Sequence, residues 1–154
     1  MTIRAAIGFV LTVLLVTSGY AENHAPNPYK TIEGWGKLPE GRVWGATSAI
    51  YPTTDGKRVW VAERCGANSC VDSPLDPILL FDLDGNLVRS FGAGLFAWPH
   101  GMYVDADDNV WVADAVGYAP VPDGWGHVIY KFSPQGEVLM VLGKKGVAGS
   151  GKDT

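Results

Sequence analysis

Apolar and polar residues alternate in short runs along this chain, and turns rich in Gly, Asp, Asn and Pro separate the runs. Val, Ile, Phe and Trp are common within the runs, which is typical of β-strands. No stretch keeps an apolar period of about 3.6 residues for long enough to predict a helix. The pattern therefore predicts an all-β protein, with strands at residues 44–51, 58–62, 78–82, 87–91, 101–104, 110–113, 128–132 and 138–142.

The chain also repeats itself once, at an offset of 51 residues. The segment Val59-Trp60-Val61-Ala62 returns as Val110-Trp111-Val112-Ala113, and similar strands and turns follow in the same order. Each unit contains four expected strands, which is the composition of a β-propeller blade. We expect blades at residues 35–95 and 96–143, a lead-in with a candidate ring-closing strand at 22–34, and an inter-blade loop at 144–154.

Two blades cannot close a ring, because propellers typically contain about four to eight. A blade also buries both of its faces only when neighbours lie on both sides of it. The sequence favours the front part of a longer propeller, with the chain truncated near Thr154. The alternative is a two-blade protein that forms a ring from several copies. Under either hypothesis, missing blades or other copies complete the ring.

The first 21 residues have the pattern of a secretory signal peptide. Arg4 precedes an apolar run at residues 5–16, and Gly19-Tyr20-Ala21 places small residues where a signal peptidase cleaves. Cleavage before Glu22 would give a secreted or periplasmic protein without a membrane span. The alternative is an uncleaved anchor, although the run is shorter than the roughly 20 residues that a span needs.

The charge balance argues against nucleic acid as a partner. The chain has 12 Lys and Arg against 16 Asp and Glu, a net charge of −4. No basic cluster is longer than a pair such as Lys144-Lys145. Nucleic-acid binding needs several clustered cations that neutralise phosphates.

The chain contains two cysteines, Cys65 and Cys70. In an exported protein they meet an oxidising compartment, so their proximity favours a disulfide that closes a short loop. Metal binding by the pair is the alternative, but it lacks the additional Cys or His ligands of a zinc site.

Two segments, at residues 82–86 and 105–109, read Asp-x-Asp-x-Asn like the start of a calcium loop. The Gly and Glu that complete an EF-hand loop are absent. Asp and Asn are favoured in β-turns for backbone reasons, so we interpret both segments as turns.

The long segments at residues 64–77 and 115–127 follow the second strand of each unit. Loops on one face of a repeat array commonly form its binding face, so we expect chemistry near Glu63, Arg64 and Asp114. Arg64 is a candidate carboxylate clamp, and the alternative is a surface arginine paired with Glu63 or Asp72. His100 begins the second unit, where it is either a metal ligand or a packing histidine.

Three parts of the chain together carry a resemblance to a known family. They are Leu38-Pro39-Glu40-Gly41, residues 78–86, and Trp98-Pro99-His100-Gly101-Met102-Tyr103-Val104-Asp105 with residues 109–114. In these segments the sequence resembles NHL-repeat propellers. Within these propellers it is similar to the peptidyl-α-hydroxyglycine α-amidating lyases, over residues 29–143. It covers the first two of that family's six blades, so the expected fold is two four-stranded blades of an NHL-type propeller.

The resemblance implies roles for three residues. His100 matches the first of three channel histidines that hold zinc, and Met102 matches a position whose backbone carbonyl helps to bind calcium. Arg64 falls where the lyases hold the substrate's carboxylate, so the implied substrate is a small molecule or peptide. Glu63 departs from the family pattern, which has histidine there. The rival hypothesis is therefore a non-catalytic propeller that binds protein or carbohydrate.

Overall fold

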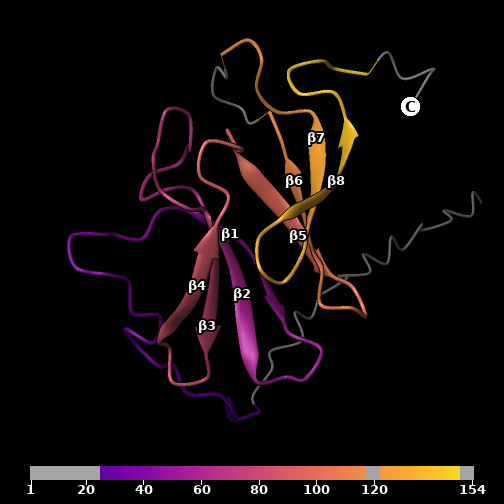
Figure 1. Cartoon of the computed structure of the whole chain (residues 1–154). Helices are drawn as coiled ribbons and strands as arrows, with labels where there is room; N and C mark the ends of the chain where they lie inside the picture. The colour runs from indigo at the N-terminus through magenta and orange to yellow at the C-terminus, as the bar shows by residue number, and fades with distance from the viewer. Residues whose placement is uncertain (1–24, 117–121, 150–154) are drawn as a thin grey trace, which may run out of the picture. The chain divides into compact units, whose positions relative to one another are not determined.

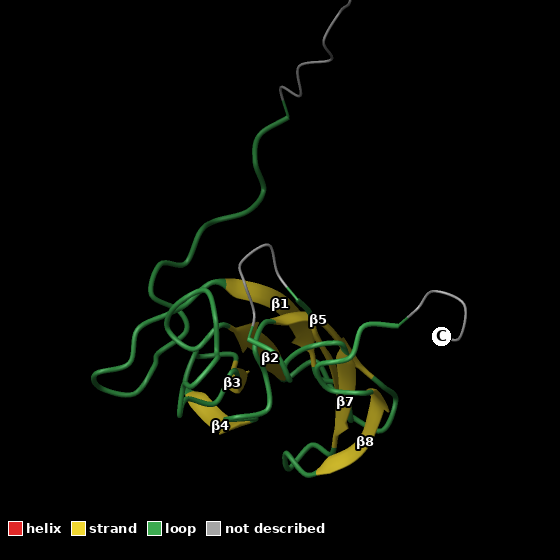
Figure 2. Cartoon of the chain, turned by 90° about the horizontal axis from the view of Figure 1, so that it is seen from above, coloured by secondary structure: helices red, strands yellow, loops and turns green. Residues whose placement is uncertain are grey.

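The computed structural model describes residues 25–116 and 122–149, so the signal peptide expected at 1–21 lies outside the described residues. Residues 32–149 contain eight strands in two antiparallel four-stranded sheets, each ordered as in the sequence (Figures 1 and 2). The first sheet has β1 (Thr47–Pro52), β2 (Arg58–Glu63), β3 (Ile78–Asp82) and β4 (Leu87–Phe91), and the second has β5 (Pro99–Val104), β6 (Val110–Asp114), β7 (Val128–Phe132) and β8 (Val138–Gly143).

The all-β prediction is confirmed, and each of the eight expected strands is present. The largest differences are at the starts of β1 and β5, the first strand of each sheet. Both strands contain a register shift at the same level, between Thr47 and Ala49 in β1 and between Pro99 and Met102 in β5. A bulge adds a residue and breaks the alternation of apolar and polar residues along a strand. The alternation therefore predicts the first residues of these two strands poorly. The described residues contain no helix that is long and apolar enough to cross a membrane.

The main hydrophobic core lies between the two sheets. Its members from the first sheet include Trp60, Ala62, Ile78, Leu80 and Phe91, and those from the second include Val104, Val110, Val112, Val128, Tyr130 and Phe132. The rings of Phe91 and Phe132 meet with centroids 4.9 Å apart. The first strands, β1 and β5, are in contact at one side of this interface. The packing of two similar sheets face to face is what adjacent propeller blades require.

The opposite face of the first sheet is covered by the segment that precedes β1. Val61, Leu79 and Phe81 form a second buried cluster, against which Trp35 and Leu38 pack. The Trp35 and Phe81 ring centroids are 5.7 Å apart. The first sheet is therefore buried on both faces.

Residues 35–37 lie against the first sheet as the end of β4 lies against the second. Trp35 contacts Phe81 in the same way that Phe91 contacts Phe132, and Phe81 and Phe132 are one repeat apart. A Cβ added to the turn glycine Gly85 would meet the backbone of Trp35, whereas one added to the equivalent Gly136 would meet Phe91. The segment thus takes the place of the outer strand of a preceding blade. The described residues 25–34 form no strand, so the ring-closing strand at 22–34 stays a prediction.

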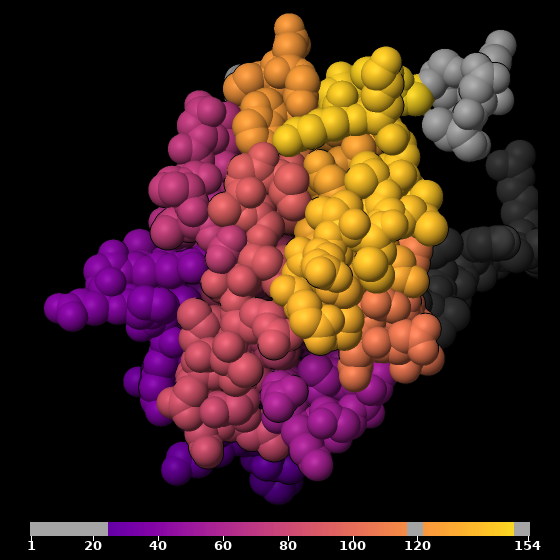
Figure 3. Space-filling view, in the orientation of Figure 1, coloured from indigo at the N-terminus to yellow at the C-terminus, as the bar shows by residue number. Residues whose placement is uncertain are grey.

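The second sheet has one uncovered face. Tyr103, Ile129 and Leu142 are 54%, 40% and 46% exposed there, and every residue of β8 is exposed. Atoms of the β8 region lie at the surface of the molecule (Figure 3). An open hollow of about 350 Å³ on this face is lined by Gly101, Met102, Tyr103, Trp111, Ala113 and Ile129. One repeat earlier, Trp60, Ala62 and Ile78 are buried in the core between the sheets. The hollow therefore lies at positions whose equivalents in the first sheet pack against a neighbouring sheet.

Candidate functional site

Glu63 and Asp114, one repeat apart at the ends of β2 and β6, organise the backbone at one end of each sheet. Glu63 is completely buried, and its Oε2 accepts hydrogen bonds from the N–H groups of Gly45 at 3.0 Å and Gly66 at 2.9 Å. Its Oε1 pairs with Arg42 at 2.5 Å. Both carboxylate oxygens are committed, so Glu63 holds the start of the first blade rather than a ligand.

Asp114 does the same in the second blade. Its carboxylate accepts hydrogen bonds from the N–H groups of Ala97, Trp98 and Gly126. Burial raises the pKa of Asp114, and these hydrogen bonds oppose that effect by stabilising the charged form. Asp114 therefore fixes the backbone that leads into β5.

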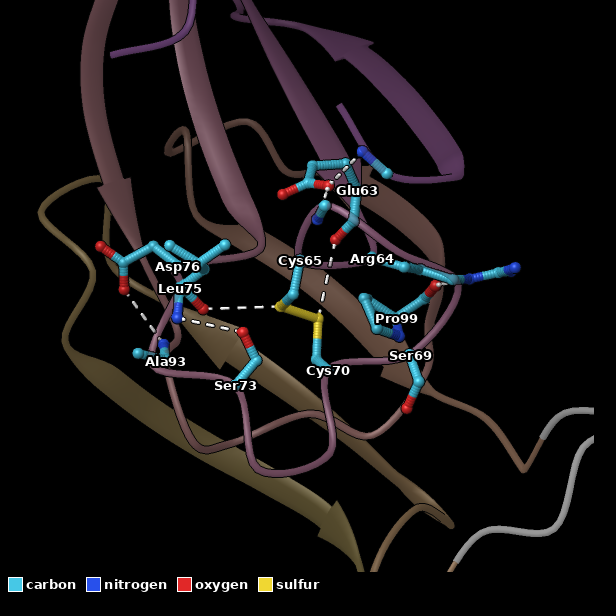
Figure 4. The surroundings of a disulfide bond; sticks show 12 residues. Glu63, Arg64, Cys65, Ser69, Cys70, Ser73, Leu75, Asp76, Ala93 and Pro99 are labelled. Carbon is cyan, nitrogen blue, oxygen red and sulfur yellow. Dashed lines mark hydrogen bonds between the residues drawn. A yellow bond between two sulfur atoms is a disulfide. The ribbon is translucent and has the colours of Figure 1, made fainter. Parts of the chain in front are cut away.

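Arg64, the residue after β2, extends from the first blade toward the second (Figure 4). Its Nε donates a hydrogen bond to the carbonyl of Pro99 at 3.3 Å, and its Nη1 donates one to Oδ1 of Asn68 at 2.5 Å. Its Cζ lies 3.6 Å from the centroid of the Trp98 ring. The predicted alternative, a surface arginine paired with Glu63 or Asp72, is wrong, because Arg64 is only 9% exposed and stacks on Trp98.

The charge of Arg64 is not balanced by a carboxylate. Among the described residues, no Asp or Glu forms an ion pair with it. Burial lowers the pKa of the Arg64 guanidinium, but arginine stays protonated at neutral pH. A buried cation with free donors is suited to binding an anionic ligand.

A disulfide joins Cys65 to Cys70 and closes the loop that carries Asn68 (Figure 4). The loop is also fixed to the second blade, because the N–H of Cys70 donates a hydrogen bond to the carbonyl of Ala97 at 2.8 Å. Both cysteines are buried. The loop therefore holds the Asn68 side chain beside Arg64, a contact that sequence reasoning did not identify.

His100 lies within the bulge of β5 and is exposed. Its ring centroid is 5.1 Å from that of Trp98, so Trp98 contacts both His100 and Arg64. The imidazole has no hydrogen-bond partner among the described residues. The Met102 side chain packs against the main core, and the residue pairs with Val112 of β6 within the sheet.

The described residues do not form a complete metal site. No three His, Cys, Asp or Glu side chains gather within residues 25–116 and 122–149. An exposed imidazole without a partner fits the role of one metal ligand, but zinc needs three or four. Zinc at His100 and calcium at Met102 remain predictions.

The two Asp-x-Asp-x-Asn segments are turns, as expected. Asp105 accepts hydrogen bonds from the backbone and side chain of Asn109, and Asp82 does the same for Asn86. Burial acts to raise the pKa of Asp105, but hydrogen bonds from Trp111, Lys131 and Asn109 outweigh it and hold the pKa well below the usual value. These carboxylates stabilise turns and are not free to bind calcium.

No protein-family model matches the chain. NHL repeat-containing protein 3 of Mus musculus is 32% identical over 121 residues, which cover 77% of this chain and 31% of that protein. Peptidyl-alpha-hydroxyglycine alpha-amidating lyase 1 of Drosophila melanogaster is 28% identical over 117 residues, 72% of this chain and 18% of the lyase. A probable lyase of the same kind from Caenorhabditis elegans is 29% identical over 110 residues, 71% and 26% of the two chains.

The chain spans less than a third of the length of each of these relatives. Two sheets of blade type agree with the similarity to NHL-repeat and amidating-lyase proteins. The resemblance of this chain to NHL-type propellers is therefore confirmed.

Proposed function

We propose that this chain is part of a secreted NHL-type propeller that acts as a metal-dependent carbon–nitrogen lyase of the amidating-lyase kind, or as a close relative with another substrate. The observation that carries the proposal is the cluster of Arg64, Trp98 and His100. It places Arg64, which is only 9% exposed and has N–H donors without an acceptor among the described residues, one aromatic ring away from the exposed imidazole of His100, which has no partner in the same residues. Two relatives named as amidating lyases support the reaction class.

The reaction would convert a peptide ending in α-hydroxyglycine into a peptide amide and glyoxylate. The hydroxyl loses its proton and becomes the aldehyde C=O of glyoxylate. The C–N bond breaks, and the nitrogen takes up a proton to give the amide. No oxidant or reductant is needed.

Arg64 would bind the carboxylate that leaves with glyoxylate and orient the hydroxyl carbon, which lowers the entropy cost of the reaction. His100 would provide one ligand for zinc, and the backbone carbonyl of Met102 one oxygen for calcium, which prefers oxygen ligands. When bound, zinc supplies Lewis-acid chemistry that makes a substrate hydroxyl easier to deprotonate. The other metal ligands would come from further blades.

The test uses the full-length protein and α-hydroxyhippurate. The expected result is benzamide and glyoxylate in equal amounts, together with bound zinc measured by elemental analysis. His100→Asn should lower zinc occupancy and turnover, whereas the matched control His127→Asn should not. His127 has a positive φ of 61°, which Asn tolerates. No zinc and no glyoxylate from the parent protein would contradict the proposal.

One observation favours the rival function, a propeller that binds protein or carbohydrate without catalysis. Glu63 replaces the histidine that the lyase pattern has at this position, and its carboxylate is occupied by the backbone and Arg42. In addition, one relative is named only for its NHL repeats. Binding of a protein or carbohydrate partner, without turnover of α-hydroxyhippurate, would favour the non-catalytic binding function.

Secretion is part of the proposal. The Cys65–Cys70 disulfide supports it, because such bonds persist mainly in oxidising compartments. N-terminal sequencing of exported protein should begin at Glu22, and protein retained in the cytoplasm with free thiols would contradict secretion.

A further inference from the structure

The guanidinium plane of Arg64 is held by contacts that do not depend on a metal. Trp98 covers one of its faces, with Cζ 3.6 Å from the ring centroid. Pro99 and Asn68 accept hydrogen bonds at two of its nitrogens. Rotation of the side chain would therefore break contacts with both blades.

Two of the five N–H donors of Arg64 are used by these contacts. The remaining three, one on Nη1 and two on Nη2, have no acceptor among the described residues. Three free donors in one plane are enough for a bidentate bond to a carboxylate. The fixed plane then determines the direction from which that carboxylate must approach.

We propose that Trp98 and Asn68 are positioning residues that orient Arg64 to bind the planar carboxylate of a small ligand. The proposal deepens the proposed function by naming the residues that hold Arg64 in place, and it rests on that function for the identity of the substrate. Trp98 fixes the plane through a cation–π contact, which does not neutralise the charge. Asn68 fixes the rotation within the plane through an uncharged acceptor.

The neutral side chain of Asn68 is central to this argument. An Asp at this position would form an ion pair with Arg64, and the ligand carboxylate would then compete with a built-in anion. A positioning contact that leaves the cation unpaired keeps the charge available for the ligand. The disulfide loop supports this arrangement, since it ties Asn68 to the end of β2 and to Ala97.

Trp125 provides a matched control. The Nζ of Lys145 lies 3.9 Å from the centroid of the Trp125 ring, so this tryptophan also contacts a cation, at a different place in the second blade. Replacing either tryptophan by Leu removes an aromatic face beside a cation. Only the change at Trp98 should affect ligands of Arg64.

The experiment measures binding of hippurate, a carboxylate that cannot react, to the full-length protein by isothermal titration calorimetry. Hippuramide, its neutral amide, is the ligand control. Hippurate should bind, and hippuramide should bind at least about 10-fold more weakly. Trp98→Leu should weaken hippurate binding by about 10-fold, within the range of a desolvated cation–π contact. Trp98→Phe should restore part of the loss, and Trp125→Leu should cause none.

The Asn68→Asp variant tests whether Asn68 orients Arg64 for ligand binding or only stabilises the fold. It should weaken hippurate binding by more than about 10-fold without lowering the midpoint of thermal unfolding, because the new carboxylate pairs with Arg64. Equal binding of hippurate and hippuramide, or hippurate affinity unchanged by both Trp98→Leu and Asn68→Asp, would overturn the proposal. Loss of glyoxylate production with these binding effects intact would instead count against the lyase function alone.

Discussion

Ile78 and Ile129 occupy equivalent positions one repeat apart, in β3 and β7, but only Ile78 lies between two sheets. Ile78 is 0% exposed, whereas Ile129 is 40% exposed on the uncovered face of the second sheet. Replacing each by Ala makes the same chemical change in two different environments. The difference in unfolding free energy therefore measures what a covering sheet contributes.

The change removes three carbon atoms, worth about 0.8 kcal/mol each when fully buried. At Ile78 the lost burial is about 2.4 kcal/mol, and the cavity left between the sheets raises the expected loss to about 3–4 kcal/mol. At Ile129 the side chain is partly in water already and no closed cavity forms, so we expect a loss of about 1–1.5 kcal/mol.

Urea unfolding of the isolated chain, followed by circular dichroism at several protein concentrations, measures both losses. Ile78→Val and Ile129→Val provide a milder pair, with expected losses of about 1 kcal/mol and less than 0.5 kcal/mol. Equal losses for the two Ala variants in a monomer would refute the reasoning, since Ile129 would then be as well covered as Ile78. Losses that become equal only as the concentration rises would instead show that another copy covers the second sheet.

Three further predictions concern charge, the disulfide and the contact between turns. Hydrogen bonds hold the pKa of Asp105 below its ordinary value of 3.8, so the ionised carboxylate stabilises the fold fully above pH 3.8, and this stabilisation is lost as the pH falls through the folded-state pKa. Asp105→Asn should therefore lower the midpoint of thermal unfolding at pH 7 and by progressively less below pH 3.8, and an equal loss at every pH would contradict this role. Replacing Cys65 and Cys70 by Ser should reduce the unfolding free energy by about 2 kcal/mol, from the loop-closure entropy, and mass spectrometry that finds two free thiols in exported protein would contradict the bond. Asp108→Ala should cost about 1–2 kcal/mol in urea unfolding, because its carboxylate accepts two hydrogen bonds from the turn of the first sheet, and no measurable loss would contradict that role.

The sequence predicted the strands well because each sheet has one face toward a core and strong turn residues between strands. Residues 78–82, 87–91 and 128–132 are strands with the expected bounds. It also predicted the equivalence of the two units, since Trp60 and Trp111 lie in matching registers. It could not show which faces are covered, because the same apolar pattern is buried in the first sheet and exposed in the second.

The candidate site was predicted only in part. Arg64 and His100 were identified from their places in the repeat, but Trp98 and Asn68 were not. Their roles depend on contacts between blades, such as that from Arg64 to Pro99, 35 residues away. The one available signal was local: Trp98 directly precedes the Pro-His-Gly segment, and Asn68 lies between two cysteines. Neither signal gives the direction in which Arg64 extends.

The candidate site has two parts, Arg64 with its contacts and His100. They differ in whether the described residues supply every contact that the part needs. The contacts of Arg64 come from the first blade and from the start of the second, and all of them lie within the described residues. His100 has no companion metal-binding side chains in the same residues, so a zinc site at His100 would need side chains from elsewhere. The proposed recognition of a carboxylate and the proposed binding of a metal are therefore separable. A protein that loses its metal should still bind hippurate through Arg64, because the face of Trp98 and the carbonyl of Pro99 hold that side chain whether or not His100 is coordinated.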